Sequence, residues 1–253
     1  MKILAAAALG LGLMTGTATS QGKFPERPIT MIVPFAAGGP TDVIARIVGD
    51  HMSKTLGQQV VVENVAGAGG TTGITRAVTA APDGYTVAMG HLGTLSAAPA
   101  TYSGLKYDPF NGIQPIGLAG GTPILIVAKK DFPPKDLKEF VTYLKANTDK
   151  INQAHAGVGS VSWTTCTLLK AQLGTEKMNA VAYRGTGPAL NDLVSGQVDF
   201  MCDQIVSVIE QVRGATIKAY AIASEKRSPA LPDVPTTSEA GFPLFKIEAW
   251  NGI

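Results

Sequence analysis

The sequence predicts an α/β protein built as two lobes, the first formed by residues 21–122 and the second by residues 123–244. Strands and helices alternate along the chain, as they do in parallel sheets that are covered by helices. The alternation restarts after an apolar strand at 123–128, and a last strand at 245–253 returns to the first lobe. The 253 residues suffice for one large or two modest domains.

The first lobe opens with a strand at Ile29–Val33, followed by a loop of small residues and then by a helix that Gly57 can end. Because the loop side chains are small, a ligand can contact the backbone there. The N–H groups at the helix start have no partners within the helix and carry the positive end of its dipole. This pattern is typical of an anion site. The helix is marked by apolar residues at every fourth position: Ile44, Val48, Met52 and Leu56.

The rest of the first lobe is expected to hold two more strands and one short helix. A strand at 59–62 and a strand at 85–89 flank a helix at 71–79. The glycine-rich stretch 64–73 before that helix is interpreted as a turn. A loop is predicted at 90–96, where the third strand ends.

The second lobe repeats the alternation. Ligands of such sheets lie beyond the carboxyl ends of the strands, so we expect a site in the cleft between the two lobes. A proline-rich loop is predicted at 228–235. The strands are predicted at 151–155, 178–183, 197–202 and 217–223, with helices around 137–144, 162–174, 188–195 and 204–212.

A loop at 157–163 repeats the pattern of the first loop, because a strand precedes its glycines and a helix follows its hydroxyls. Ser160 and Ser162 suit two roles: capping that helix, or holding an anion. Two such loops, one in each lobe, would grip one anionic ligand from both sides. We favour this second interpretation.

Three further positions are candidates for the cleft. Arg184 follows a strand and suits either a bidentate clamp on a carboxylate or an exposed structural role. Asp203 and Gln204 come at the end of another strand, and Asp203 is equally suited to capping the next helix. His91 is a candidate to line the cleft from the first lobe.

Composition and motifs argue against several classes of protein. Lys and Arg total 21 against 19 for Asp and Glu, and no basic block is present, which disfavours nucleic-acid binding. P-loop and G-x-S-x-G motifs are absent, and Thr72 stands where a dinucleotide fingerprint needs its third glycine. The histidines lack metal-ligand spacing. We therefore expect no catalytic residue, no metal and no cofactor.

Residues 1–20 have the pattern of a secretory signal, with Lys2 before an apolar run and Ser20 at a small-residue cleavage site before Gln21. The apolar run is too short to span a membrane comfortably. We expect an exported, soluble protein. In an oxidising compartment the single pair Cys166 and Cys202 is more suited to a disulfide than to two buried thiols.

The order of several motifs along the mature chain is specific. They lie at 27–42, 63–70, 81–86, 107–110, 159–160, 183–185 and 227–236. Together they resemble the Bug or TctC family, the periplasmic solute-binding receptors of tripartite tricarboxylate transporters. The resemblance covers essentially all of the mature chain.

The resemblance implies a periplasmic-binding-protein (Venus flytrap) fold, type II-like, that closes around a small mono- or dicarboxylate. It also implies a monomer in the periplasm that delivers the ligand to membrane permease subunits. Backbone amides of both loops would hold one carboxylate. The implied contacts are Phe35, Ala36, Ala37, Gly38, Gly39, Thr41, Asp42, Gly159, Ser160 and Ser162, with His91, Thr94, Arg184, Gly185, Thr186 and Asp203 around the far end.

Two departures from the family pattern stand out. Trp163 replaces a frequent histidine, so an aromatic ligand could stack there. The family normally continues past the strand at 250–253, which implies a first lobe without its C-terminal helices. Two other functions compete: a receptor that presents its ligand to a membrane kinase, and an exported hydrolase using Ser160 or Asp203, for which no activating base is visible.

Overall fold

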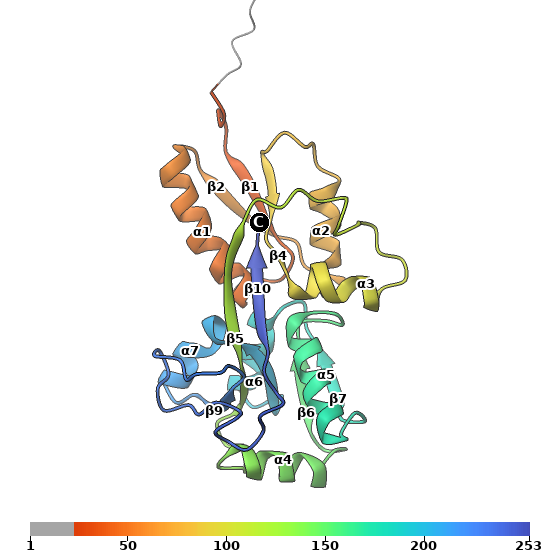
Figure 1. Ribbon diagram of the computed structural model, residues 1–253, viewed down its shortest axis with the longest axis vertical. Helices are drawn as coiled ribbons and strands as arrows, with labels where there is room; N and C mark the ends of the chain where they lie inside the picture. Colours follow the sequence, from red (N-terminus) through yellow and green to blue (C-terminus); the bar gives the residue numbers. More distant parts are fainter. Residues whose placement is uncertain (1–22) are drawn as a thin grey trace, which may run out of the picture.

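The structure, a computed structural model, describes residues 23–253 as two α/β lobes joined by two neighbouring antiparallel strands (Figure 1). These crossing strands are β5 (Leu118–Lys129) and β10 (Glu248–Gly252). The expected two-lobe α/β fold is confirmed. The signal segment at 1–20 lies outside the described residues. Within 23–253 no helix combines the length and apolarity needed to span a membrane.

The first lobe is a three-stranded parallel sheet in the order β2-β1-β3, flanked by two helices (Figure 1). Alternate residues of the first strand, Met31 and Val33, pack with Ile44 of the first helix in one core. The elements are β1 (Ile29–Val33), α1 (Pro40–Leu56), β2 (Val60–Asn64), a 3-10 turn at Ala68–Gly70, α2 (Thr71–Val78) and β3 (Thr86–Ala88).

The segment after β3 differs from the predicted loop at 90–96. It forms β4 (Gly90–His91), a π-helical turn at Gly93–Ala97 and α3 (Ala98–Thr101). The Tyr107 hydroxyl donates to the Thr94 carbonyl at 2.5 Å and supports this turn from outside. No local periodicity encodes such a contact, so sequence reasoning missed it.

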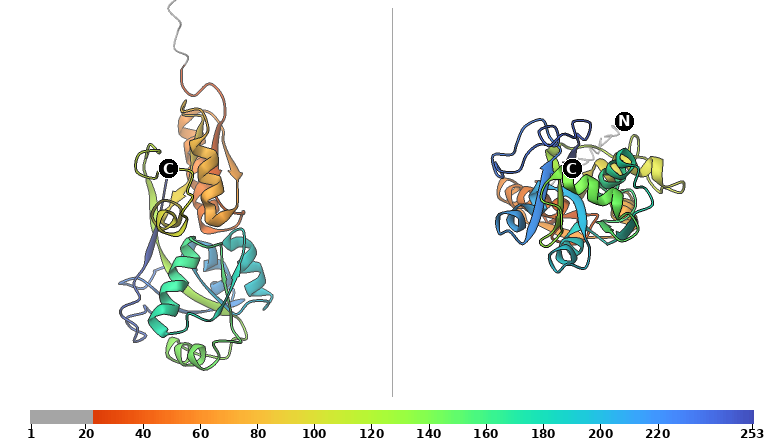
Figure 2. Two further views of the ribbon diagram at one scale, coloured as in Figure 1. Left: turned by 90° about the vertical axis from the view of Figure 1, so that its right-hand side faces the viewer. Right: turned by 90° about the horizontal axis from the view of Figure 1, so that it is seen from below.

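The second lobe is built on a sheet in which β5 is central. The strand order is β4-β10-β5-β8-β6-β7. β9 pairs with residues 125–129 of β5, on the edge opposite β8 and beyond the part of β5 that pairs with β10. Figure 2 shows the helices of this lobe packed around the sheet. The elements are α4 (Leu137–Ala146), β6 (Asn152–His155), α5 (Val161–Leu173), β7 (Asn179–Ala182), α6 (Thr186–Val194), β8 (Phe200–Gln204), α7 (Ile205–Arg213) and β9 (Ile217–Ile222).

The crossing strand β5 is longer than predicted. It begins at Leu118 rather than at residue 123, so the predicted boundary between lobes falls inside one continuous strand. In the second lobe Ile124 and Ile126 belong to one core and Leu125 and Val127 to another. Both faces of this part of the strand are therefore covered, which explains its unbroken apolar run.

The predicted disulfide between Cys166 and Cys202 is present, with 5.5 Å between the two Cα atoms. It ties α5 to β8 inside the core of the second lobe. The two cysteines are 36 residues apart in the chain. Closing a loop of that length in the unfolded chain stabilises the fold by about 4 kcal/mol.

We predict that reducing this disulfide lowers the melting temperature by roughly 10 °C, because the unfolded chain regains the entropy of the open loop. Calorimetry with and without a thiol reductant measures the shift. The double variant Cys166→Ala/Cys202→Ala is the control, and reductant should leave its melting temperature unchanged. Equal melting temperatures for the oxidised and fully reduced wild type would contradict the prediction.

Candidate functional site

A small cavity lies between the two lobes. It encloses about 20 Å³, the space of one or two water molecules. The first lobe contributes the loop after β1, the start of α1 and His91, and the second lobe contributes the starts of three helices. Its lining is Phe35, Gly39, Pro40, Thr41, His91, Ala156, Ser160, Val161, Ser162, Thr186, Asp203 and Gln204.

Four helices begin at this cavity. Their N-cap residues are Gly39 for α1, Ser160 for α5, Gly185 for α6 and Gln204 for α7. The first N–H groups of each helix lack partners within the helix, and each start carries a partial positive charge. Among the described residues no Lys or Arg lines the cavity. The backbone therefore supplies the positive potential, which favours an anion.

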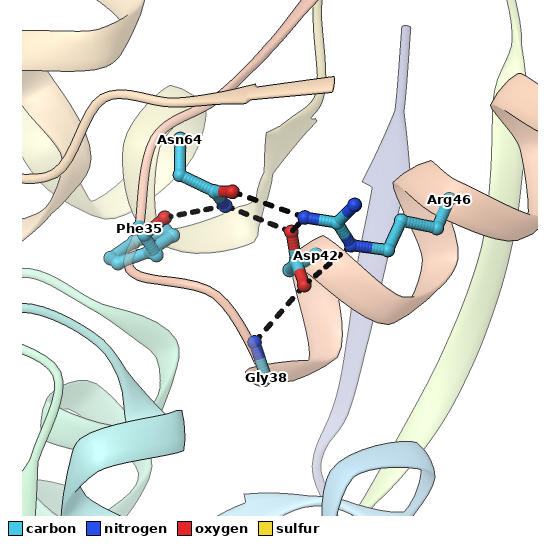
Figure 3. Close-up of polar contacts among 5 residues, drawn as sticks. All are labelled: Phe35, Gly38, Asp42, Arg46 and Asn64. Atoms are coloured by element: carbon cyan, nitrogen blue, oxygen red, sulfur yellow. Dashed lines mark hydrogen bonds and ion pairs between the residues drawn. The ribbon is translucent and has the colours of Figure 1, made fainter. Parts of the chain in front are cut away.

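Asp42 holds the first loop in place (Figure 3). Its carboxylate accepts the Gly38 N–H at 3.0 Å, the Asn64 amide at 2.8 Å and two bonds from Arg46 at 2.9 and 3.0 Å. Asn64 also donates to the Phe35 carbonyl at 3.0 Å. Gly38 has φ +84°, a left-handed conformation that suits glycine. The network fixes the path of the loop into α1.

The Asp42 carboxylate is 4 % exposed yet ionised. Burial raises its pKa, but the hydrogen bonds from Arg46, Gly38 and Asn64 outweigh burial and hold the pKa below its usual value. Because these donors occupy the carboxylate and Asp42 does not line the cavity, its role is positioning. The resemblance implies a ligand contact for Asp42, and in this closed arrangement its hydrogen bonds instead hold the loop before α1.

His91 reaches the cavity as a neutral ring. Burial lowers the pKa of His91 to about 4. Its Nδ1 accepts the Thr94 N–H at 3.0 Å, so the proton of the neutral ring is on Nε2. The ring stacks on Phe35 with 4.8 Å between the centroids. His91 is therefore a fixed neutral donor, and Thr94 orients it from outside the lining.

Asp203 is the one acidic residue in the lining and is 1 % exposed. It belongs to β8 rather than to a loop, and Gln204 is the N-cap of α7. The Ser207 hydroxyl donates to its Oδ2 at 2.5 Å. Burial raises the pKa of Asp203 to about 6, although hydrogen bonds from Ser207, Gln204 and Thr186 act in the opposite direction.

The two lobes touch through backbone atoms beside the cavity. Ala36 N–H donates to the Arg184 carbonyl at 3.1 Å, and the Tyr102 hydroxyl donates to the Val158 carbonyl at 2.7 Å. A Cβ atom added at Gly187 would lie 2.2 Å from the Ala37 carbonyl oxygen. The lobes are therefore in contact in a closed arrangement. We call the contact between residues 36–37 and residues 184–187 the seam, and at Gly187 it leaves no room for a Cβ atom.

Gln204 connects the cavity to both crossing strands. Its Oε1 accepts the Asn251 side-chain amide of β10 at 3.0 Å and also the Thr122 hydroxyl of β5. Asn251 is fully buried. Gln204 thus links the cavity by one hydrogen bond to β5 and by another to β10, the two strands that connect the lobes.

The structure brings together about half of the residues that the sequence placed at the site. Those in the lining are Phe35, Gly39, Thr41, His91, Ser160, Ser162, Thr186 and Asp203. Those outside it are Ala36, Ala37, Gly38, Asp42, Thr94, Gly159, Trp163, Arg184 and Gly185.

The residues outside the lining have other positions. Ala36, Ala37 and Gly185 lie at the seam between the lobes. Arg184 has an exposed side chain and contributes its carbonyl instead, so the structure shows no clamp. The Trp163 side chain is half-buried. Its backbone N–H donates to the hydroxyl of Ser160, and this hydrogen bond caps α5.

Sequence reasoning missed three lining residues: Pro40, Ala156 and Val161. Ala156 and Val161 are apolar and carry no chemical signal. Pro40 had a usable signal, since proline favours the first position of a helix and so marks where the unpaired N–H groups begin.

Two α/β lobes that are joined by crossing strands and enclose an anion-favouring cavity define a two-lobe solute-binding protein of the periplasmic class. A model of the family described as the tripartite tricarboxylate transporter family receptor, TctC, matches residues 44–253. A protein of Agrobacterium vitis from the TAR-I ttuE-ttuC' intergenic region is 41% identical over 241 residues, which are 95% of this chain and 69% of that protein. The chain belongs to the TctC family of solute-binding receptors.

Solved structures agree with this assignment. The periplasmic binding protein BugD is 47% identical with a TM-score of 0.88, over 90% of this chain and 76% of that one. MatC (Rpa3494) of Rhodopseudomonas palustris, solved with bound malate, is 51% identical with a TM-score of 0.87, over 90% and 78%. Rpa4515 of R. palustris, solved with adipate, is 28% identical with a TM-score of 0.86, over 90% and 76%.

We predict that Asp42→Ala lowers the free energy of unfolding by about 2–3 kcal/mol, because donors from Gly38, Asn64 and Arg46 lose a charged and nearly buried acceptor. Asp50→Ala on the same helix is the matched control. Asp50 pairs with Lys54 in an exposed i,i+4 ion pair, so its loss should cost less than about 0.5 kcal/mol. Urea denaturation of both variants measures the difference, and equal costs would contradict the positioning role.

We predict that Gly187→Ala opens the lobes without harming the fold. The new methyl group would meet the Ala37 carbonyl only in the closed arrangement, whereas alanine favours the α6 helix by up to about 1 kcal/mol over glycine. Small-angle X-ray scattering should show a larger radius of gyration. Gly104→Ala, where nothing lies within 4 Å of the added atom, is the control. If neither variant changed the radius of gyration, the inferred close contact between Gly187 and the Ala37 carbonyl would be wrong.

Proposed function

We propose that this protein is a periplasmic receptor that captures a small mono- or dicarboxylate between its lobes and delivers it to the permease subunits of a transporter. The observation that carries the proposal is the convergence of four helix N-termini on a cavity that no Lys or Arg of residues 23–253 lines. Backbone amides at helix starts bind carboxylates as well as phosphates. Relatives solved with malate and adipate favour the carboxylate.

The ligand carboxylate would lie between the starts of α1 and α5. N–H groups near Thr41 and Ser162 and the neutral His91 ring supply donors from both lobes. Because both lobes contribute donors, the ligand binds the closed form more tightly than an open form. Ligand binding then shifts the population toward closure.

Entry of the ligand requires motion of the lobes. A cavity of about 20 Å³ is smaller than any dicarboxylate, so the lobes must part about β5 and β10 to admit one and must close around it less tightly than in this arrangement. The hydrogen bonds of Gln204 to Thr122 and Asn251 place the cavity next to this hinge. Opening about a few strand residues is the usual motion of such receptors.

We infer that the site holds its ligand without reacting with it. The Ser160 hydroxyl contacts Ser162 at 3.2 Å and the Trp163 N–H at 3.2 Å, and neither is a base. A serine nucleophile needs an activating base within hydrogen-bond reach. Release of unchanged ligand to a membrane permease fits this arrangement.

We predict that the protein binds at least one of malate and adipate with a Kd of about 10 µM or tighter and does not bind the corresponding diamides, which lack the negative charge. Isothermal titration calorimetry measures both. Gly39→Leu should weaken binding at least roughly a hundredfold, because its Cβ atom would lie 2.7 Å from Thr186 Oγ1 and keep the lobes from closing over the ligand, whereas Gly104→Ala should bind as the wild type does. Diamide binding equal to acid binding would contradict a carboxylate site.

A further inference from the structure

The cavity that favours an anion also contains a buried carboxyl group. Asp203 lines it from the second lobe, opposite Thr41 and His91 of the first. No Lys or Arg of residues 23–253 lines the cavity to neutralise it. A ligand carboxylate drawn to the helix starts therefore comes close to Asp203 in an enclosed space. Two carboxylates in contact cannot both remain ionised, and such pairs share a proton.

Among residues 23–253, only backbone N–H groups and hydroxyls bring positive potential into the lining beside Asp203. The β5 residue opposite Asp203 is Leu125. His91 is neutral, and burial also lowers the pKa of His155 at the end of β6. The hydroxyls nearby are those of Ser160, Thr186 and Ser207. The charged groups on the surrounding helices are already paired or lie away from the lining: Asp42 with Arg46 and Asp50 with Lys54 on α1, Glu210 with Arg213 on α7, Asp192 with the Tyr183 hydroxyl on α6, His51 on α1 and Lys170 on α5.

We propose that the receptor takes up its carboxylate ligand together with a proton, which resides on Asp203 and donates a hydrogen bond to the ligand. The inference rests on the proposed function of the site. The Ser207 hydroxyl already donates to Oδ2, and Gln204 and Thr186 also donate to this carboxyl group, so the proton must reside on whichever oxygen faces the ligand. Asp203 thereby becomes a donor and joins the backbone amides in holding the acid.

Burial favours the protonated form of Asp203 already in the free protein, because it raises the pKa to about 6, well above the usual value of a carboxyl group. A bound ligand carboxylate raises the pKa further, and the complex then keeps the proton at neutral pH. Binding must weaken as pH rises above the pKa of the free protein, by up to about tenfold per pH unit.

Calorimetric titration with malate and with adipate at pH 7, in buffers of different ionisation enthalpy, counts the protons taken up per ligand. We expect close to one for the wild type. For Asp203→Asn we expect close to zero and an affinity that does not change between pH 7 and 8. Ser207→Ala should move the onset of the wild-type pH dependence upward, because ionised Asp203 loses a donor.

Folding of Asp203→Asn can be checked independently. A carboxyl whose pKa is raised on folding stabilises the protein below its unfolded pKa, and this contribution disappears as pH rises through about 6. The asparagine variant should thus be at least as stable as the wild type at pH 8. Tight binding of malate or adipate by the wild type without proton uptake would overturn the inference and leave the proposed function standing. Binding of neither acid would overturn both.

Discussion

The unpaired backbone N–H groups at four helix starts are the constraint around which this protein is organised. They create positive potential in a closed cavity without any basic side chain, and they come from both lobes. A site made from backbone needs the backbone to approach closely, and the seam at Gly187 and Ala37 shows how closely the lobes meet. Asp203 also lines this cavity, and protonation of its carboxyl group would set the charge of the cavity.

Rigid support surrounds this backbone site. The Asp42 network fixes the loop before α1, and the disulfide from Cys166 to Cys202 fixes α5 against β8. The lobes are connected by the crossing strands β5 and β10, and Gln204 is joined to both of them by side-chain hydrogen bonds. Each half of the site is thus held within its own lobe, so the proposed closure requires only that the two halves move relative to one another.

The sequence predicted the lobes, most strands and helices, the disulfide and both small-residue loops, because these features follow from local periodicity, glycine placement and cysteine pairing. It predicted the loop at 90–96 wrongly, since the turn there depends on the distant Tyr107. It could not separate lining residues from supporting ones. For Asp42 and Arg184 the sequence allowed a ligand contact; in this structure Gly38 and Asn64 donate to the Asp42 carboxylate, and Arg184 contributes its carbonyl to the contact between the lobes.

Amide chemical shifts offer the most direct measurement of the central claim that the helix starts hold the ligand. In ¹⁵N-labelled protein titrated with malate or adipate, the largest shifts should come from the N–H groups of Gly39, Thr41, Val161 and Ser162 on both sides of the cavity. Saturable shifts that spare these four amides and cluster elsewhere would contradict the account.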